Sequence, residues 1–126
     1  MGRHILGIAP QLLVSDLGQA IDYYRDELGF DLDFQYESFY GSVSRDHCAL
    51  HLKQTSDIRA DRESRIKNED LDAYISVCDI RVLFAELEQR GARILKALES
   101  RPWGCLDFYV QDPDGNLLCF SEPLSQ

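Results

Sequence analysis

The residues of this chain that could do chemistry are three histidines, four cysteines and a set of aromatic and acidic side chains. The histidines, His4, His47 and His51, are too few for a metal centre rich in imidazole. The chain contains no Ser/His/Asp order, no glycine-rich phosphate loop and no P-loop. The cysteines have no C-x-x-C spacing, which predicts free thiols in a reducing cytoplasm. These residues therefore give little support to nucleophilic catalysis or nucleotide chemistry.

The elements that must position these residues follow from a pattern that occurs twice. Seven positions in the first half have counterparts of like polarity 63 residues later. They are Leu12, Val14, Asp16, Leu17, Ala20, Ile21 and Tyr24, matched by Ile75, Val77, Asp79, Ile80, Leu83, Phe84 and Leu87. The alternation before each aspartate predicts a strand, and the i, i+3, i+4, i+7 spacing after it predicts a helix. Asp16 and Asp79 are the expected N-caps of these helices.

Further strand-like runs follow each predicted helix. They cover residues 32–36, 40–44 and 48–52, then 92–95, 106–110 and 117–120. The unit is therefore βαβββ, twice, and we predict an α+β fold with two such modules in one pseudo-symmetric domain spanning residues 1–126. We expect module one at residues 5–53, a charged and partly helical linker at 54–70, and module two at 71–123. Pro113 and Gly115 predict a tight turn over residues 112–116.

Composition and charge limit the classes of partner. A chain of 126 residues with 44% hydrophobic residues can bury one core, and its apolar runs are shorter than the ~20 residues of a membrane span. The net charge of −9 argues against binding to nucleic acid or to an anionic membrane and favours a neutral or cationic partner. We therefore expect a cytoplasmic protein with a small-molecule ligand and with no nucleic-acid or membrane partner.

Two motifs together carry a resemblance to a known family. The first is Pro10-x-Leu12-x-Val14-x-Asp16-Leu17 with Tyr24 and Leu28-Gly29-Phe30; the second is Pro102-Trp103-Gly104 followed by residues 108–120, FYVQDPDGNLLCF. They closely resemble the vicinal oxygen chelate superfamily, which includes glyoxalase I, bleomycin resistance proteins and extradiol dioxygenases. The resemblance covers nearly the whole chain and implies two βαβββ modules. For the bleomycin-resistance group it also implies a homodimer, often with an exchanged N-terminal strand, whose ligand grooves form where the subunits meet.

The same resemblance implies where a metal would be held in the members that are enzymes. The family's ligand positions, usually His, Glu or Gln, fall here on Ala9, His51, Asp72 and Cys119. Ala9 cannot coordinate a metal, and Cys119 replaces the carboxylate of the last strand. His51, Asp72 and Cys119 are in principle zinc ligands, but the set is incomplete, and we expect neither a metal nor another cofactor.

Strand alternation predicts which residues share a face with those positions. Phe39, Tyr40 and Trp103 are expected at the rim of that face. The predicted cavity is rich in tyrosine and tryptophan and carries two carboxylates, which suits a planar cationic ligand. The candidate ligand-binding residues are Gln11, Phe39, Tyr40, His51, Asp72, Tyr74, Trp103, Asp107, Tyr109 and Cys119.

These features favour a metal-free protein that resembles bleomycin resistance proteins and sequesters an aromatic or cationic compound, a function tied to antibiotic resistance. Two alternatives remain open. One is a metal-dependent lyase, isomerase or dioxygenase that uses His51, Asp72 and a further ligand. The other is a binding module for a metabolite unrelated to drugs.

Overall fold

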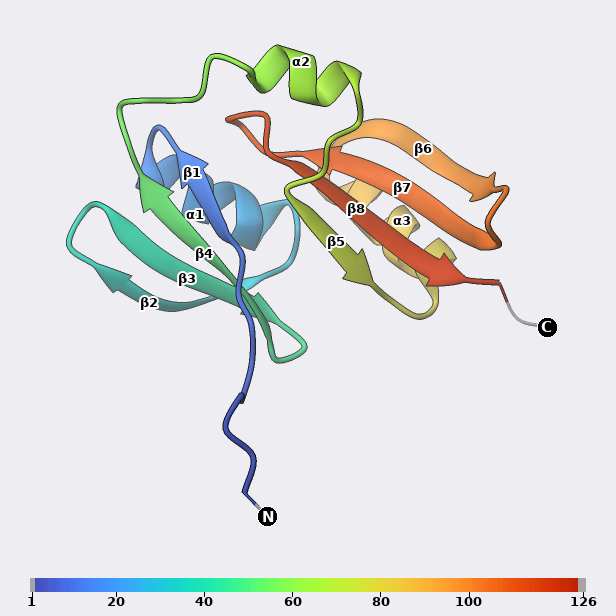
Figure 1. Cartoon of the computed structure of the whole chain (residues 1–126), viewed down its shortest axis with the longest axis horizontal. Helices are drawn as coiled ribbons and strands as arrows, with labels where there is room; N and C mark the ends of the chain where they lie inside the picture. The colour runs from blue at the N-terminus through green and yellow to red at the C-terminus, as the bar shows by residue number, and fades with distance from the viewer. Residues whose placement is uncertain (1, 125–126) are drawn as a thin grey trace.

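The structure is a computed structural model that describes residues 2–124, and it contains the βαβββ unit twice, as the repeat predicts. The first module consists of β1 (Gln11–Val14), α1 (Leu17–Asp26), β2 (Asp31–Tyr36), β3 (Tyr40–Arg45) and β4 (Cys48–Gln54). The second consists of β5 (Ala73–Ser76), α3 (Ile80–Arg90), β6 (Arg93–Arg101), β7 (Cys105–Gln111) and β8 (Leu117–Pro123). Between them, α2 (Arg62–Lys67) lies above both sheets in the view of Figure 1. No helix within residues 2–124 is long and apolar enough to cross a membrane.

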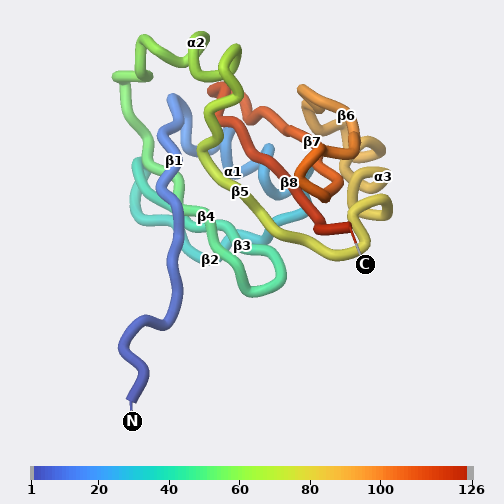
Figure 2. The backbone as a smooth tube through the Cα atoms, turned by 45° about the vertical axis from the view of Figure 1, so that its right-hand side comes forward, coloured from blue at the N-terminus to red at the C-terminus, as the bar shows by residue number. Residues whose placement is uncertain are grey.

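Each module forms its own four-stranded sheet, and the two sheets have the same strand order. The orders are β1-β4-β3-β2 and β5-β8-β7-β6, and the first strand of each module runs parallel to its last. Leu12 pairs with Leu52 of β4, and its repeat counterpart Ile75 pairs with Phe120 of β8. The two copies of the repeat therefore occupy equivalent strands. The edge strands β1 and β5 face each other at the seam between the modules (Figures 1 and 2).

Each helix packs on one face of its own sheet, and we call the opposite faces the open faces. Gln11, Ser42 and His51 are paired across the open face of the first sheet. Strand alternation directs the apolar residues between them to the helix side. There, residues of both modules join in one hydrophobic core that includes Val14, Tyr24, Leu52, Leu87, Phe108, Val110 and Leu118.

The helices α1 and α3 begin differently, although each follows the repeated aspartate. The Asp16 carboxylate accepts a hydrogen bond from the Gln19 backbone N–H at 2.9 Å, which confirms the predicted N-cap. Asp79 has a left-handed backbone, with φ of 54°, and its side chain makes no capping hydrogen bond. The Ile80 N–H donates instead to the Glu122 carboxylate of β8 at 2.9 Å. The predicted Asp79 cap is therefore wrong, because a distant carboxylate takes its place.

The turn before β8 ties the modules together through a buried aspartate. Gly115 has φ of 83°, and its N–H donates to the Asp112 carbonyl at 3.0 Å, so the predicted tight turn is confirmed. Asp112 is fully buried, and its carboxylate accepts hydrogen bonds from the Tyr24 hydroxyl and the Asn116 backbone N–H, both at 2.9 Å. The Asn116 side-chain amide donates to the Leu13 carbonyl at 2.9 Å. These bonds hold α1 and β1 against the turn of the second module.

The segment before β1 leaves the body of the protein (Figures 1 and 2). Its side chains Ile5, Leu6 and Ile8 are 79%, 88% and 90% exposed. Burying a side chain of this kind is worth about 1.5–3 kcal/mol. An exposed apolar patch of this sort is typical of a surface that contacts another chain.

Candidate ligand-binding site

The open face of the first sheet carries a cluster of aromatic rings. Phe34 and Tyr40 stack with ring centroids 6.5 Å apart and planes 9° apart, and His51 meets Tyr40 edge to face at 5.5 Å. The Tyr40 hydroxyl lies 2.9 Å from His51 Nδ1 and accepts a hydrogen bond from the Gln11 side-chain amide at 3.1 Å. Phe39 packs edge to face on Tyr40 at 6.4 Å. We call Phe34, Phe39, Tyr40 and His51 the aromatic platform.

Most of this cluster was predicted, but Phe34 was missed. The pairing of β2 with β3 slips between Leu32 and Phe34, so that Leu32 faces Val43 and Phe34 faces Ser42. Regular alternation would place Leu32 and Phe34 on the same face, and the bulge is what turns the Phe34 ring to the open face. Phe34 is 48% exposed, so part of its ring remains accessible to a ligand.

On the open face of the second sheet, several predicted residues surround Arg101. Its guanidinium carbon lies 5.3 Å from the Tyr109 ring centroid and 5.8 Å from that of Trp103. Its Nε is 3.5 Å from the carboxylate of Asp107, which is 2% exposed. An arginine of this chain therefore already pairs with Asp107, which we expected to face a cationic ligand.

Tyr109 and Cys119 pair across β7 and β8, and both are held in their protonated forms. The Tyr109 hydroxyl donates to the Glu69 carboxylate at 3.1 Å, and burial together with this carboxylate raises the pKa of Tyr109 to about 12. Burial and the nearby Asp107 carboxylate raise the pKa of the Cys119 thiol to about 12. The thiolate, which is the reactive and metal-binding form, is therefore scarce at neutral pH. Tyr74, on the neighbouring strand β5, is 58% exposed.

Asp72 lies at the seam beneath α2 and is surrounded by donors. Its Oδ2 is 3.1 Å from Arg62 Nη1 and accepts a hydrogen bond from the Leu117 N–H at 2.8 Å, while its Oδ1 is 3.3 Å from Arg65 Nη2. Two arginines of this chain therefore already pair with Asp72, which we also expected to face a cationic ligand. A cavity of about 170 Å³ lies beside this carboxylate, and we call it the seam cavity. It is lined by Gln11, Leu13, Arg59, Arg62, Asp72 and Asn116.

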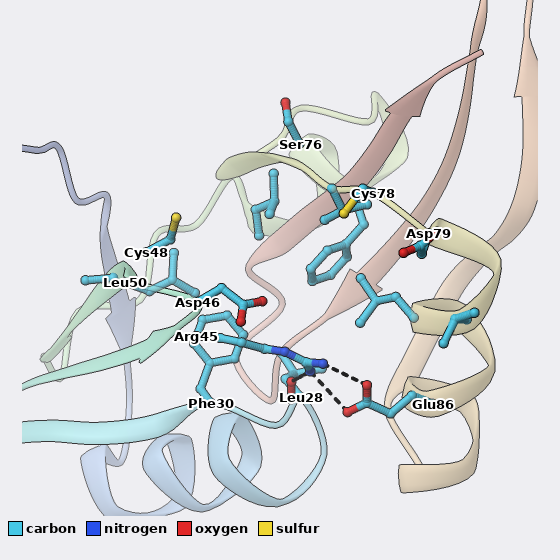
Figure 3. Close-up of a pocket in the computed structure, with 16 residues that line it drawn as sticks. Leu28, Phe30, Arg45, Asp46, Cys48, Leu50, Ser76, Cys78, Asp79 and Glu86 are labelled. Carbon is cyan, nitrogen blue, oxygen red and sulfur yellow. Dashed lines mark hydrogen bonds and ion pairs between the residues drawn. The ribbon is translucent and has the colours of Figure 1, made fainter. Parts of the chain in front are cut away.

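A larger cavity, of about 650 Å³, lies between the modules (Figure 3). Its walls come mainly from β4 with the turn before it, from β5 and from α3, and they are largely apolar. Arg45 and Glu86 form an ion pair of 2.7 Å at this cavity, and the exposed Cys48 and Cys78 belong to its two walls. None of the predicted ligand-binding residues lines it. Sequence reasoning missed it because it arises only where the two modules meet.

Comparison with known proteins defines the family. The model of the Glyoxalase/Bleomycin resistance protein/Dioxygenase superfamily matches residues 4–120, and the chain belongs to this superfamily. No curated protein matches it significantly.

Solved structures show the same fold. The glyoxalase/bleomycin resistance protein/dioxygenase of Alicyclobacillus acidocaldarius is 20% identical with a TM-score of 0.77, covering 94% of this chain and 92% of its own. A glyoxalase-related enzyme of Clostridium phytofermentans is 17% identical with a TM-score of 0.77, covering 98% of both chains. The bleomycin-binding protein of Streptomyces verticillus, complexed with copper(II)-bleomycin, is 24% identical with a TM-score of 0.70, covering 99% of this chain and 100% of its own.

The positions at which the family resemblance implies metal ligands do not fit a metal ion here. Ala9 has no donor atom, and the Asp72 carboxylate is paired with two guanidinium groups. Cys119 is a buried thiol on β8, and His51 lies on β4 of the other sheet. Within residues 2–124, no three His, Cys, Asp or Glu side chains come together as a metal-binding group.

Proposed function

We propose that this protein binds a planar aromatic small molecule without a metal ion and sequesters it unchanged. The observation that carries this proposal is the aromatic platform, where stacked and edge-on rings offer faces to a planar ligand. The pairing of Asp72 and Asp107 with arginines supports an aromatic ligand over a purely cationic one. Tight binding alone lowers the free concentration of a drug, and such sequestration would be a route to antibiotic resistance.

The bleomycin-binding protein of Streptomyces verticillus supports a binding role, because a chain with this fold holds a small molecule there. The exposed thiols Cys48 and Cys78 are unpaired, which favours a reducing compartment such as the cytoplasm.

Aromatic binding is tested by NMR titration of the labelled protein with naphthalene-2-carboxamide, an uncharged planar probe. We expect chemical-shift changes at Tyr40 and His51. Phe34→Ala should lower the affinity for the probe about 2- to 13-fold, because an aromatic pair contributes about 0.5–1.5 kcal/mol beyond its buried area. The control is Leu95→Ala, which removes a 43% exposed apolar side chain from the second module. Equal affinity of the two variants, or shifts confined to the surroundings of Trp103, would contradict the proposed site.

The metal-free part of the proposal is tested with a chelator. We expect the purified protein to hold no stoichiometric divalent ion and EDTA to leave its melting temperature unchanged. An ion bound only to the folded state would stabilise it by mass action, so its removal would lower that temperature. A clear drop, together with a metal-dependent turnover that His51→Ala abolishes, would favour the metal-dependent lyase, isomerase or dioxygenase instead.

A homodimer is part of the same proposal. Three features suit contact with a second copy of the chain. They are the exposed side chains Ile5, Leu6 and Ile8, the edge of β5 that pairs with no strand among residues 2–124, and the apolar cavity beside β5. We expect a dimer in analytical ultracentrifugation and a shift toward monomer when these three residues are replaced by serine. A wild-type protein that stays monomeric at high micromolar concentration would rule out this arrangement.

A further inference from the structure

The seam cavity has hydrogen-bond donors nearby that the described chain leaves unused. The Nε of Arg62 is buried and has no hydrogen-bond partner within residues 2–124, although Nη1 of the same side chain bonds to Asp72. The Nε of Arg65, on the same helix, is also buried without a partner among those residues. Arg59 lines the cavity, and its ion pair with Asp61 is long, at 3.5 Å, and about half exposed. The protein encloses these two Nε atoms, so a group in the seam cavity contacts Arg59 and Arg62 through the parts of their side chains that line it.

Arginines outnumber carboxylates in the lining of the seam cavity, although the chain as a whole carries −9. Arg59 and Arg62 line it against the single carboxylate of Asp72. That carboxylate is also paired with Arg65 and the Leu117 N–H, so both of its oxygens are already engaged. A cavity of about 170 Å³ exceeds the ~30 Å³ share of one water molecule and has room for a carboxylate group.

We infer that the ligand of the aromatic platform carries an anionic group, a carboxylate in the simplest case, which the seam cavity receives beside Arg59 and Arg62. This inference rests on the proposed function. Gln11 connects the two places, because its side chain lines the seam cavity and donates to the Tyr40 hydroxyl. The seam cavity therefore adjoins the platform, with the side chain of Gln11 between them. Hydrogen bonds between arginine and carboxylate are charge-assisted and stronger than those between neutral groups.

Three probes with the same ring and different charge test the inference. They are naphthalene-2-carboxylate, naphthalene-2-carboxamide and 2-naphthylmethylammonium, each titrated into the full chain by NMR. We expect the carboxylate to bind at least about fivefold more tightly than the carboxamide, and the ammonium compound to bind most weakly.

Arg59→Gln is the variant to use, because Arg62 and Arg65 also hold Asp72 in place. It should lower the affinity for the carboxylate more than the affinity for the carboxamide, so that the preference is reduced while Arg62 stays in the cavity. The matched control is Arg81→Gln on α3, an exposed arginine outside the seam cavity, which should keep the preference.

The outcomes separate the inference from the proposed function. Equal affinity of the three probes with shifts at the aromatic platform, or tighter binding of the ammonium compound there, overturns the anionic ligand and leaves aromatic binding standing. A carboxylate preference that is undiminished in Arg59→Gln also overturns the assignment to the seam cavity. Binding of none of the three overturns the proposed function and this inference together.

Discussion

Replacing Asp112 with alanine should lower the free energy of unfolding by about 2–5 kcal/mol. Alanine leaves the Tyr24 hydroxyl and the Asn116 backbone N–H without an acceptor, and both residues are buried. Each such loss costs about 1–3 kcal/mol. Two further donors to the Asp112 carboxylate should lose less. The Asn116 side-chain amide still donates to the Leu13 carbonyl, and the Asp114 N–H lies in a partly exposed part of the turn. Burial raises the pKa of Asp112, so removing its charge offsets a small part of the loss.

Two further variants make this prediction specific. Asp112→Asn keeps the shape and one acceptor oxygen but sets an NH2 group against donors of the other oxygen, and we expect it to cost about 1–3 kcal/mol. Asp114→Asn makes the same chemical change in the same turn at a partly exposed side chain, and it should stay within about 0.5 kcal/mol of the wild type. Urea unfolding at neutral pH, followed by circular dichroism, measures all three. If Asp112→Ala were as stable as Asp114→Asn, the hydrogen bonds of Asp112 would not hold the modules together and the reasoning would be refuted.

Three other measurements follow from charge and burial. The hydrogen bond from Arg45 lowers the pKa of Glu86 from 4.5, so the ionised Glu86 stabilises the folded state. This contribution is complete above pH 4.5 and is lost as the pH falls through the lowered pKa. The midpoints of urea unfolding measured in acid will show the loss. Burial raises the pKa of Tyr23 from 10.0 to about 12. The stability that accompanies this shift should therefore be fully present below pH 10.0, and the free energy of unfolding should decline as the pH rises through about 12. Tyr23→Phe should reduce that decline. In the variant with Ile5, Leu6 and Ile8 replaced by serine, a thiol reagent should label the exposed Cys48 and Cys78 in the folded protein and the two buried cysteines only after unfolding.

The fold was predictable because its signals are local and occur twice. The apolar alternation at Leu12 and Ile75 and the helical spacing after each are properties of neighbouring residues, and strands and helices form there. The start of α3 was not predictable in detail. The Ile80 N–H at its start bonds to Glu122, and only the pairing of β5 with β8 brings that carboxylate near.

The candidate site was likewise predictable only where its signals are local. Tyr40 and His51 come together because simple alternation places both on the open face. Phe34 joins them only through a bulge, and a single sequence carries no clear mark of it. The partners of the carboxylates were also hidden, since Arg101 reaches Asp107 across a strand pair with shifted register.

The linker between the modules determines the charge of the candidate site, although its sequence resembles an ordinary solvated segment. It supplies the arginines that surround Asp72, and its Glu69 accepts the Tyr109 hydroxyl and pairs with Lys96 at 2.8 Å. From the sequence, the net charge of −9 favours a cationic partner. A total charge, however, does not show which charged groups line a particular cavity. Within a few ångströms, individual ion pairs outweigh the summed field of distant charges, which salt screens over about 10 Å. The anionic ligand that we infer therefore rests on two arginines of the linker, Arg62 in α2 and Arg59 before it.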